Sequence, residues 1–176
     1  MRPVRTIALT GATGFIGGVF LRHLVRQGYR VRALSRRPCD PVDDVEWIPG
    51  SLEDDAALAT LVAGADAVVH CAGAVRGASA ESFVRTNVDG SRRLVEAARA
   101  GGRCGRFLLI SSLAARHPEL SWYAASKRDA ERVVAKAAGD MALTVFRPTA
   151  VYGPGDRELR PLFEWLLRGW LFIPGS

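Results

Sequence analysis

The sequence is poor in residues that commonly hold metal ions. Its 176 residues include three cysteines and three histidines. The cysteines are odd in number and show no metal-ligand spacing, and the histidines are dispersed along the chain. These residues are Cys39, Cys71, Cys104, His23, His70 and His117. We therefore expect no metal site, packing or surface roles for the histidines, and a reduced, cytoplasmic compartment.

Long apolar runs are also missing. No uninterrupted apolar stretch approaches the roughly 20 residues that a membrane-spanning helix needs. Arg2 and Arg5 precede an apolar stretch, as in a signal peptide, but a glycine turn interrupts it and no cleavage region is recognisable. The sequence therefore predicts neither a membrane span nor a signal peptide.

Basic residues outnumber acidic ones, 24 to 18, which gives a net charge of +6 carried mostly by arginine. The arginines are scattered and not clustered with aromatic residues, so we expect no nucleic-acid partner. A positive field would favour an acidic, phosphorylated ligand. Because 48% of the residues are apolar and the length suits one domain, a single sizeable core is expected.

Short apolar strands alternate with amphipathic helices along the whole chain. Strands are expected at 7–9, 30–34, 45–48, 67–70, 107–110 and 143–146. Helices are expected at 15–27, 54–64, 81–100, 122–138 and in the tail from 161 to 176. This alternation predicts an α/β fold, a doubly wound parallel sheet of the Rossmann type with about six strands and helices on both faces.

The first expected strand runs into a glycine-rich turn that contains Gly11, Gly14 and Gly17. Glycines let the backbone approach a pyrophosphate closely, and the N-terminus of the following helix stabilises its negative charge. A strand before the turn and a helix after it are the context that a dinucleotide site requires. The same pattern also fits a plain strand-to-helix turn.

The second expected strand ends in Leu34-Ser35-Arg36-Arg37-Pro38, without a nearby carboxylate. A carboxylate at this place usually binds the ribose 2′-hydroxyl of NAD, whereas arginine suits the 2′-phosphate of NADP. Arg36 therefore predicts NADP as the cofactor, with NAD as the alternative. Two surface arginines without any role are the other interpretation.

A candidate catalytic set follows the fifth expected strand. Tyr123 and Lys127 are four residues apart and so share one helix face. The free tyrosine pKa is about 10, and a nearby lysine charge would lower it toward the working range of a general acid or base. Ser111 and Ser112 lie at the strand end, where sites form in open α/β sheets.

Several segments together resemble the extended short-chain dehydrogenase/reductases, the NAD-dependent epimerase/dehydratase group. They include the glycine turn, the serine pair, the Tyr-x-x-x-Lys sequence and the tail motif Arg-Pro-Thr-Ala-Val-Tyr-Gly-Pro-Gly at 147–155. The segments Asn-Val-Asp-Gly-Ser at 87–91 and His-Cys-Ala-Gly at 70–73 resemble two further motifs of that family. The resemblance covers nearly the whole chain in the family's order.

The resemblance implies that Tyr123 is the general acid/base, that Lys127 lowers its pKa and holds the nicotinamide ribose, and that Ser112, in preference to Ser111, binds the reacting oxygen. It also implies pyrophosphate contacts for Gly11, Gly14, Phe15, Ile16 and Gly17, and adenine contacts for Ser51 and Leu52. Ala72 and Gly73 would contact the middle of the cofactor, and Pro148 and Val151 its nicotinamide end. Asn87 would support the active-site helix.

The chain departs from the family pattern in three places. Ser51 stands where many members have aspartate, which leaves adenine binding possible. Leu113 and Ala114 stand where the dehydratases have an Asp-Glu pair, so dehydration is not expected. Members of the family run on for well over another hundred residues. We therefore expect a dinucleotide-binding domain at 1–156 and the start of a truncated substrate-binding region at 157–176.

These observations predict an NADP-preferring oxidoreductase or epimerase that acts on a hydroxyl or ketone of a small molecule. Sugar nucleotides are the leading substrate class by resemblance. The alternative is a catalytically idle NADP-binding module that serves as a subunit or redox sensor. The resemblance also implies a homodimer that uses the helix of Tyr123.

Overall fold

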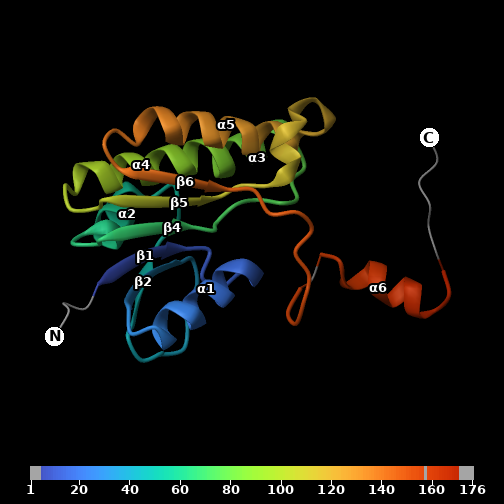
Figure 1. Ribbon diagram of the computed structural model, residues 1–176, viewed down its shortest axis with the longest axis horizontal. Coiled ribbons are helices and arrows are strands. Elements are labelled where there is room, and N and C mark those ends of the chain that lie inside the picture. The colour runs from blue at the N-terminus through green and yellow to red at the C-terminus, as the bar shows by residue number, and fades with distance from the viewer. Residues whose placement is uncertain (1–4, 157, 171–176) are drawn as a thin grey trace.

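A computed structural model describes residues 5–156 and 158–170. Its sheet has six parallel strands in the order β3-β2-β1-β4-β5-β6 (Figure 1). The strands are β1 (Thr6–Thr10), β2 (Arg30–Ser35), β3 (Val45–Pro49), β4 (Ala67–His70), β5 (Arg106–Ile110) and β6 (Ala142–Phe146). The first strand is central, because Ile7 pairs with Val31 on one side and with Ala67 on the other. The predicted fold class is confirmed.

Helices connect the strands and cover the sheet: α1 (Phe15–Arg26), α2 (Asp55–Val62), α3 (Ala80–Phe83), α4 (Gly90–Ala100) and α5 (Trp122–Ala137). A last helix, α6 (Arg160–Leu167), follows β6, lies apart from the sheet (Figure 1) and has no buried residue. The helix predicted at about 81–100 is present and runs without a break from Ala80 to Ala100, but its segment Val84–Asp89, between α3 and α4, is π-helical. Two 3₁₀ turns, Leu113–Arg116 and Pro118–Leu120, precede α5.

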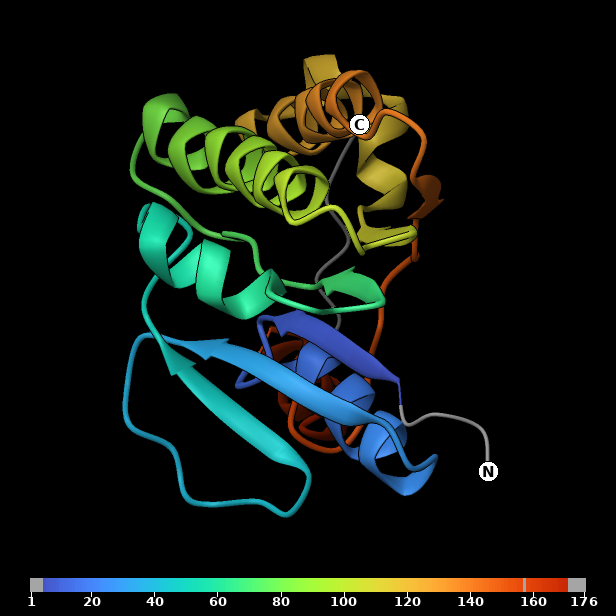
Figure 2. The ribbon, with the colours of Figure 1, turned by 90° about the vertical axis from the view of Figure 1, so that its left-hand side faces the viewer.

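The two faces of the sheet carry different cores. On one face, α2, α4 and α5 pack over residues such as Leu58, Leu94 and Phe107. On the other face, α1 packs over Leu9 and Val31 (Figure 2). Strand β6 forms the far edge, and most of its residues are exposed.

The local sequence explains where the elements begin and end. The carboxylate of Asp54 accepts a hydrogen bond from the Ala57 N–H at 3.0 Å and caps α2 as expected. Ser121 caps α5 in the same way. The tail was predicted to be helical from 161 to 176, but α6 ends at Leu167. Gly169 follows with φ of +80°, a conformation that ends helices. Residues 171–176 of that expected helix lie outside the described residues.

The described helices are too short or too polar to span a membrane. None of the helices in residues 5–156 and 158–170 combines the length and the apolar character that crossing a bilayer requires.

Candidate functional site

A long cleft lies at the carboxyl ends of the strands, at the point where the strand order reverses between β1 and β4. It consists of two adjoining hollows of about 370 and 540 Å³. Both hollows share Gly11, Gly14, Cys71 and Gly73 in their walls. The predicted glycine turn therefore lies in the middle of the cleft, and the hollows extend from it to either side.

The glycine turn leaves no room for side chains. Gly11 has φ of +73°, and a Cβ there would come within 2.6 Å of the Ala72 nitrogen. A Cβ on Gly17 would overlap the carbonyl oxygen of Gly11. Gly14 precedes α1 and has no side chain to cap it. The first N–H groups of α1 thus face a cradle formed by backbone, which fits the pyrophosphate of a dinucleotide.

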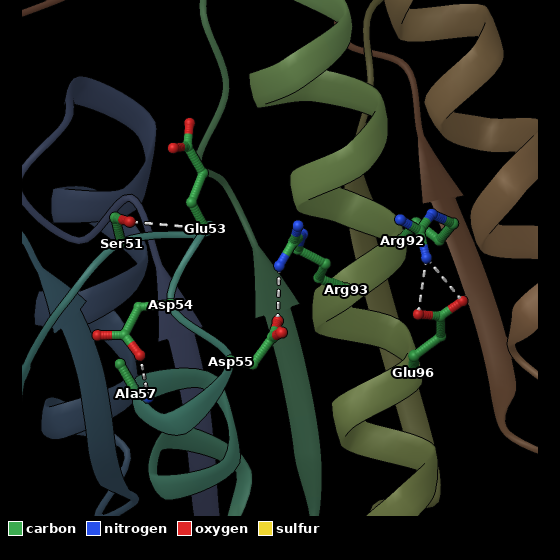
Figure 3. Close-up of polar contacts among 8 residues, drawn as sticks. All are labelled: Ser51, Glu53, Asp54, Asp55, Ala57, Arg92, Arg93 and Glu96. Atoms are coloured by element: carbon green, nitrogen blue, oxygen red, sulfur yellow. Dashed lines mark hydrogen bonds and ion pairs between the residues drawn. The ribbon is translucent and has the colours of Figure 1, made fainter.

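The first hollow contains the residues predicted to lie near the adenosine. Arg36, Ser51 and Leu52 line it together with Ala72. Ser51 Oγ accepts a hydrogen bond from the Glu53 N–H at 3.1 Å (Figure 3). The structure therefore brings the four residues together at one end of the cleft.

Contacts between helices hold this end in place. A Cβ on Gly90, the first residue of α4, would come within 2.8 Å of Leu52, so only glycine lets α4 approach so closely. Arg93 on α4 donates to Asp55 on α2 at 2.9 Å (Figure 3). Both contacts fix the segment after β3 against α4.

The second hollow contains the predicted catalytic residues. Ser112 and Tyr123 line it, and besides Gly11 and Gly14 six further residues predicted to bind the cofactor line it as well. These are Phe15, Ile16, Gly17, Gly73, Pro148 and Val151. The Tyr123 ring packs edge-on against Phe83 with 6.3 Å between ring centroids. Ser112 Oγ accepts a hydrogen bond from the Ala114 N–H at 3.2 Å and so caps the first 3₁₀ turn.

Lys127 lies behind Tyr123 and does not line the cleft. Its side chain is buried, and Nζ donates to the carbonyl oxygen of Ile110 at 2.7 Å. Burial lowers the pKa of Lys127 to about 8, although the carboxylate of Glu131 opposes the shift. The ammonium of Lys127 therefore has a pKa close to neutral pH, and it lies one helical turn from Tyr123.

Asn87 is buried in the π-helical segment and supports the cleft through hydrogen bonds to neighbouring segments. Its amide forms two hydrogen bonds with the backbone of Ala74, at 2.7 and 3.0 Å, and donates to Ser126 Oγ at 2.9 Å. Ser126 Oγ in turn donates to the Tyr123 carbonyl oxygen at 2.8 Å. Asn87 thus links the loop after β4 to the first turn of α5.

His70 joins the same network, and sequence analysis assigned it no role in the site. Thr10 Oγ1 lies 2.6 Å from its Nδ1, and Ser91 Oγ lies 2.8 Å from its Nε2. The Ser91 hydroxyl donates to the Asn87 carbonyl oxygen at 2.5 Å, so Nε2 carries the proton and Nδ1 accepts from Thr10. Burial lowers the pKa of His70 to about 3, so the ring is neutral. The sequence feature that could have indicated this role is the position of His70 at the end of an apolar strand.

A second buried cluster lies at the ends of β5 and β6. Ser111 Oγ donates to Glu131 Oε1 at 2.5 Å, and Arg147 donates to both carboxylate oxygens, at 2.8 and 2.5 Å. Sequence analysis missed Glu131, although its position four residues after Lys127 places it on the same helix face. Both serines line the second hollow, but the Ser111 hydroxyl is engaged in this cluster.

The described residues contain no group of three or more histidine, cysteine or carboxylate side chains that could hold a metal ion. Leu113 and Ala114, which stand where the dehydratases have an Asp-Glu pair, form the 3₁₀ turn after Ser112. The wall of the second hollow carries the hydroxyl groups of Ser112 and Tyr123, with the Lys127 ammonium buried nearby, and its carboxylates are Asp156 and Glu158.

The curated relatives of this chain include reductases, dehydrogenases and a sugar-nucleotide dehydratase. The chain is 46% identical over 168 residues to ceramide reductase from Caulobacter vibrioides (strain NA1000 / CB15N), which covers 92% of this chain and 51% of the relative. It is 37% identical over 194 residues to 2-alkyl-3-oxoalkanoate reductase from Stenotrophomonas maltophilia (strain K279a), covering 97% and 58%. The chain thus spans about half the length of these curated relatives.

A solved structure, MoeE5 in complex with UDP-glucose and NAD, superimposes with a TM-score of 0.79 at 30% identity over 94% of this chain and 62% of that one. Residues 7–168 match the NAD dependent epimerase/dehydratase family. That match includes all six strands, the glycine turn and the Tyr-x-x-x-Lys helix. The chain belongs to the NAD dependent epimerase/dehydratase family.

Proposed function

We propose that this chain is the cofactor-binding and catalytic part of an NAD(P)-dependent reductase that converts a ketone of a small molecule to an alcohol. The observation that carries the proposal is the placement of Tyr123 and Ser112 in the wall of the second hollow, with the Lys127 ammonium buried behind them. On this proposal residues 1–156 form the dinucleotide-binding domain, and 157–176 begin a substrate-binding region.

Each residue has one task in the reaction. Ser112 donates a hydrogen bond to the carbonyl oxygen and orients it. Tyr123 gives its phenolic proton to that oxygen, and the Lys127 charge stabilises the phenolate that remains. A bound reduced nicotinamide supplies the hydride that reaches the carbonyl carbon. Asn87 and Ser126 keep the first turn of α5 in register with the loop after β4.

The relatives favour reduction of an alkyl-chain substrate over the sugar nucleotides that the sequence put first. The two curated relatives at 46% and 37% identity are both named as reductases, of ceramide and of 2-alkyl-3-oxoalkanoates. Sugar nucleotides are the second candidate class, because the solved relative MoeE5 holds UDP-glucose. A turnover screen that contains both classes separates them.

The test of the catalytic proposal is Tyr123→Phe, which removes one hydroxyl group from the wall of the cleft. We expect turnover to fall by a factor of about 10² to 10⁴, the usual contribution of a general acid, while NADPH affinity is retained. Turnover is measured by NADPH oxidation, and affinity by calorimetry. Unchanged turnover would refute the assignment of Tyr123, and NADPH binding without any turnover in the parent chain would favour the idle module.

We also propose that the cofactor is NADP, on the strength of Arg36 in the wall of the first hollow. Arg36→Ala should weaken NADPH binding by about 10- to 100-fold, the value of a charge-assisted phosphate contact, and leave NADH binding nearly unchanged. Arg37→Ala, one residue farther along the loop, is the matched control. Equal losses for the two cofactors would rule out a 2′-phosphate contact.

A further inference from the structure

Three residues of α5 lie at four-residue spacing and so follow one face of the helix: Tyr123, Lys127 and Glu131. The first lines the cleft, and the other two are buried behind it. Glu131 is the deepest of the carboxylates in ion pairs, with 8% of its side chain exposed. A charge that is buried so deeply must be stabilised by specific partners.

Glu131 has such partners on two neighbouring strand ends. Ser111, just after β5, and Arg147, just after β6, occupy its two oxygens, and Arg128 lies 3.6 Å away on the preceding turn of α5. Burial alone would raise the pKa of Glu131, but the hydrogen bonds from Arg147 and Ser111 outweigh it and keep the pKa below its usual value. Glu131 is therefore an anion at neutral pH.

The groups around Lys127 leave Glu131 as its counter-charge. Cys71 after β4 is a neutral thiol, because burial raises its pKa to about 12. His70 is a neutral imidazole, as described above. Tyr123 lies one turn earlier on α5. Among these described neighbours of Lys127, Glu131 alone carries a negative charge.

We propose that Glu131 is a positioning residue that keeps Lys127 protonated and ties α5 to the strand ends bearing Ser112 and Pro148. Since Ser111 precedes Ser112 and Arg147 precedes Pro148, one carboxylate holds both cleft segments against the helix of Tyr123. The inference rests on the proposed function only in the role that it gives to Lys127. The contacts of Glu131 with Ser111 and Arg147 do not depend on turnover.

The chain contains only two lysines, Lys127 and Lys136, which permits a direct test. In protein labelled with ¹³Cε-lysine, each lysine gives its own NMR signal, and the exposed Lys136 is an internal reference. We expect Glu131→Gln to move the titration midpoint of Lys127 down by about one pH unit or more, because a nearby negative charge favours the ammonium. The midpoint of Lys136 should not move.

Two further variants separate charge from hydrogen bonding. Glu131→Asp keeps the charge, so its shift should be less than half that of the glutamine variant. Arg147→Gln removes a cation and should move the Lys127 midpoint upward, and it replaces Glu131→Gln as the test if that variant does not fold. Glu96→Gln, on the exposed side of α4, is the control.

An unchanged Lys127 midpoint in folded Glu131→Gln would overturn the inference, and so would equal shifts in the aspartate and glutamine variants or a downward shift in Arg147→Gln. None of these measurements uses substrate or cofactor. A failed reductase assay therefore counts against the proposed function, and a failed titration counts against the role of Glu131.

Discussion

At the β1–α1 turn the cleft is formed by backbone atoms, whereas at its α5 end it is backed by buried side chains that carry charge or donate hydrogen bonds. The turn depends on what is absent: a Cβ at Gly11 or Gly17 would meet backbone. The α5 end depends on what is present, including the Lys127 ammonium and the Glu131 carboxylate. The first end is constrained by sterics and the second by electrostatics.

This difference predicts two kinds of sensitivity. A steric constraint does not change with pH and tolerates no added atom. An electrostatic constraint tolerates changes in shape but costs folding free energy, because a buried charge loses its hydration. Variants at the two ends of the cleft test this contrast between a steric and an electrostatic constraint.

The largest effect is expected at Gly17. Gly17→Ala places a methyl group against the Gly11 carbonyl oxygen, and we expect a loss of about 3 kcal/mol in the free energy of unfolding together with loss of NADPH binding. Gly18→Ala is the matched control, because a Cβ there meets its nearest atom at 3.4 Å. It should gain up to about 1 kcal/mol through helix propensity. Urea denaturation measures both, and similar losses would argue against the steric constraint.

A smaller effect of opposite sign is expected at Lys127. Its pKa of about 8 lies below the free value of 10.5, so the folded state binds its proton less well than the unfolded chain does. Lys127→Met removes that cost of about 3 kcal/mol at pH 7 but loses one hydrogen bond worth about 1 kcal/mol, which leaves a gain of about 2 kcal/mol. The gain should shrink between pH 8 and 10.5.

Lys136→Met, on the exposed side of α5, is the control and should change neither the stability nor its pH dependence. A destabilised Lys127→Met variant at pH 7 would mean that the buried ammonium stabilises the fold. The contrast between the two ends of the cleft would then fail.

The third effect is on the pH dependence of stability, and it is the smallest when taken per pH unit. The pKa of His70 is about 3 in the folded state and 6.5 in the unfolded chain, so below pH 6.5 only the unfolded chain takes up this proton and stability falls. Between about pH 6.5 and 4.5 the free energy of unfolding should fall by about 1.4 kcal/mol per pH unit on this account. His70→Gln should flatten the slope by that amount, whereas His117→Gln, on an exposed side chain, should leave it unchanged.

The sequence predicted the elements well where one local pattern was sufficient. Strand β4 was predicted at its observed bounds, because a buried parallel strand is a short apolar run. The glycine turn was predicted as well, since its requirements lie within seven residues. The π-helical segment was missed, because its hydrogen bonds change while its composition remains that of a helix.

The candidate site could be predicted only in part, for a related reason. Residues that line the cleft belong to local motifs, but the networks behind it join distant segments. Thr10 and His70 are 60 residues apart, and Ser111 and Glu131 are 20 apart. No periodic pattern encodes such pairs. The spacing also placed Lys127 beside Tyr123 without showing that Lys127 is buried.

Of the six strands, β1 is made first during synthesis and yet lies in the middle of the sheet. It can pair with β2 as soon as that strand emerges from the ribosome, but its other edge remains unpaired until β4 has been made. A nascent chain that ends soon after β3 therefore exposes an apolar strand edge, the kind of surface that chaperones bind and that aggregates form from. Ribosome-bound chains that end before β4 should accordingly be cut by protease faster than chains that include it.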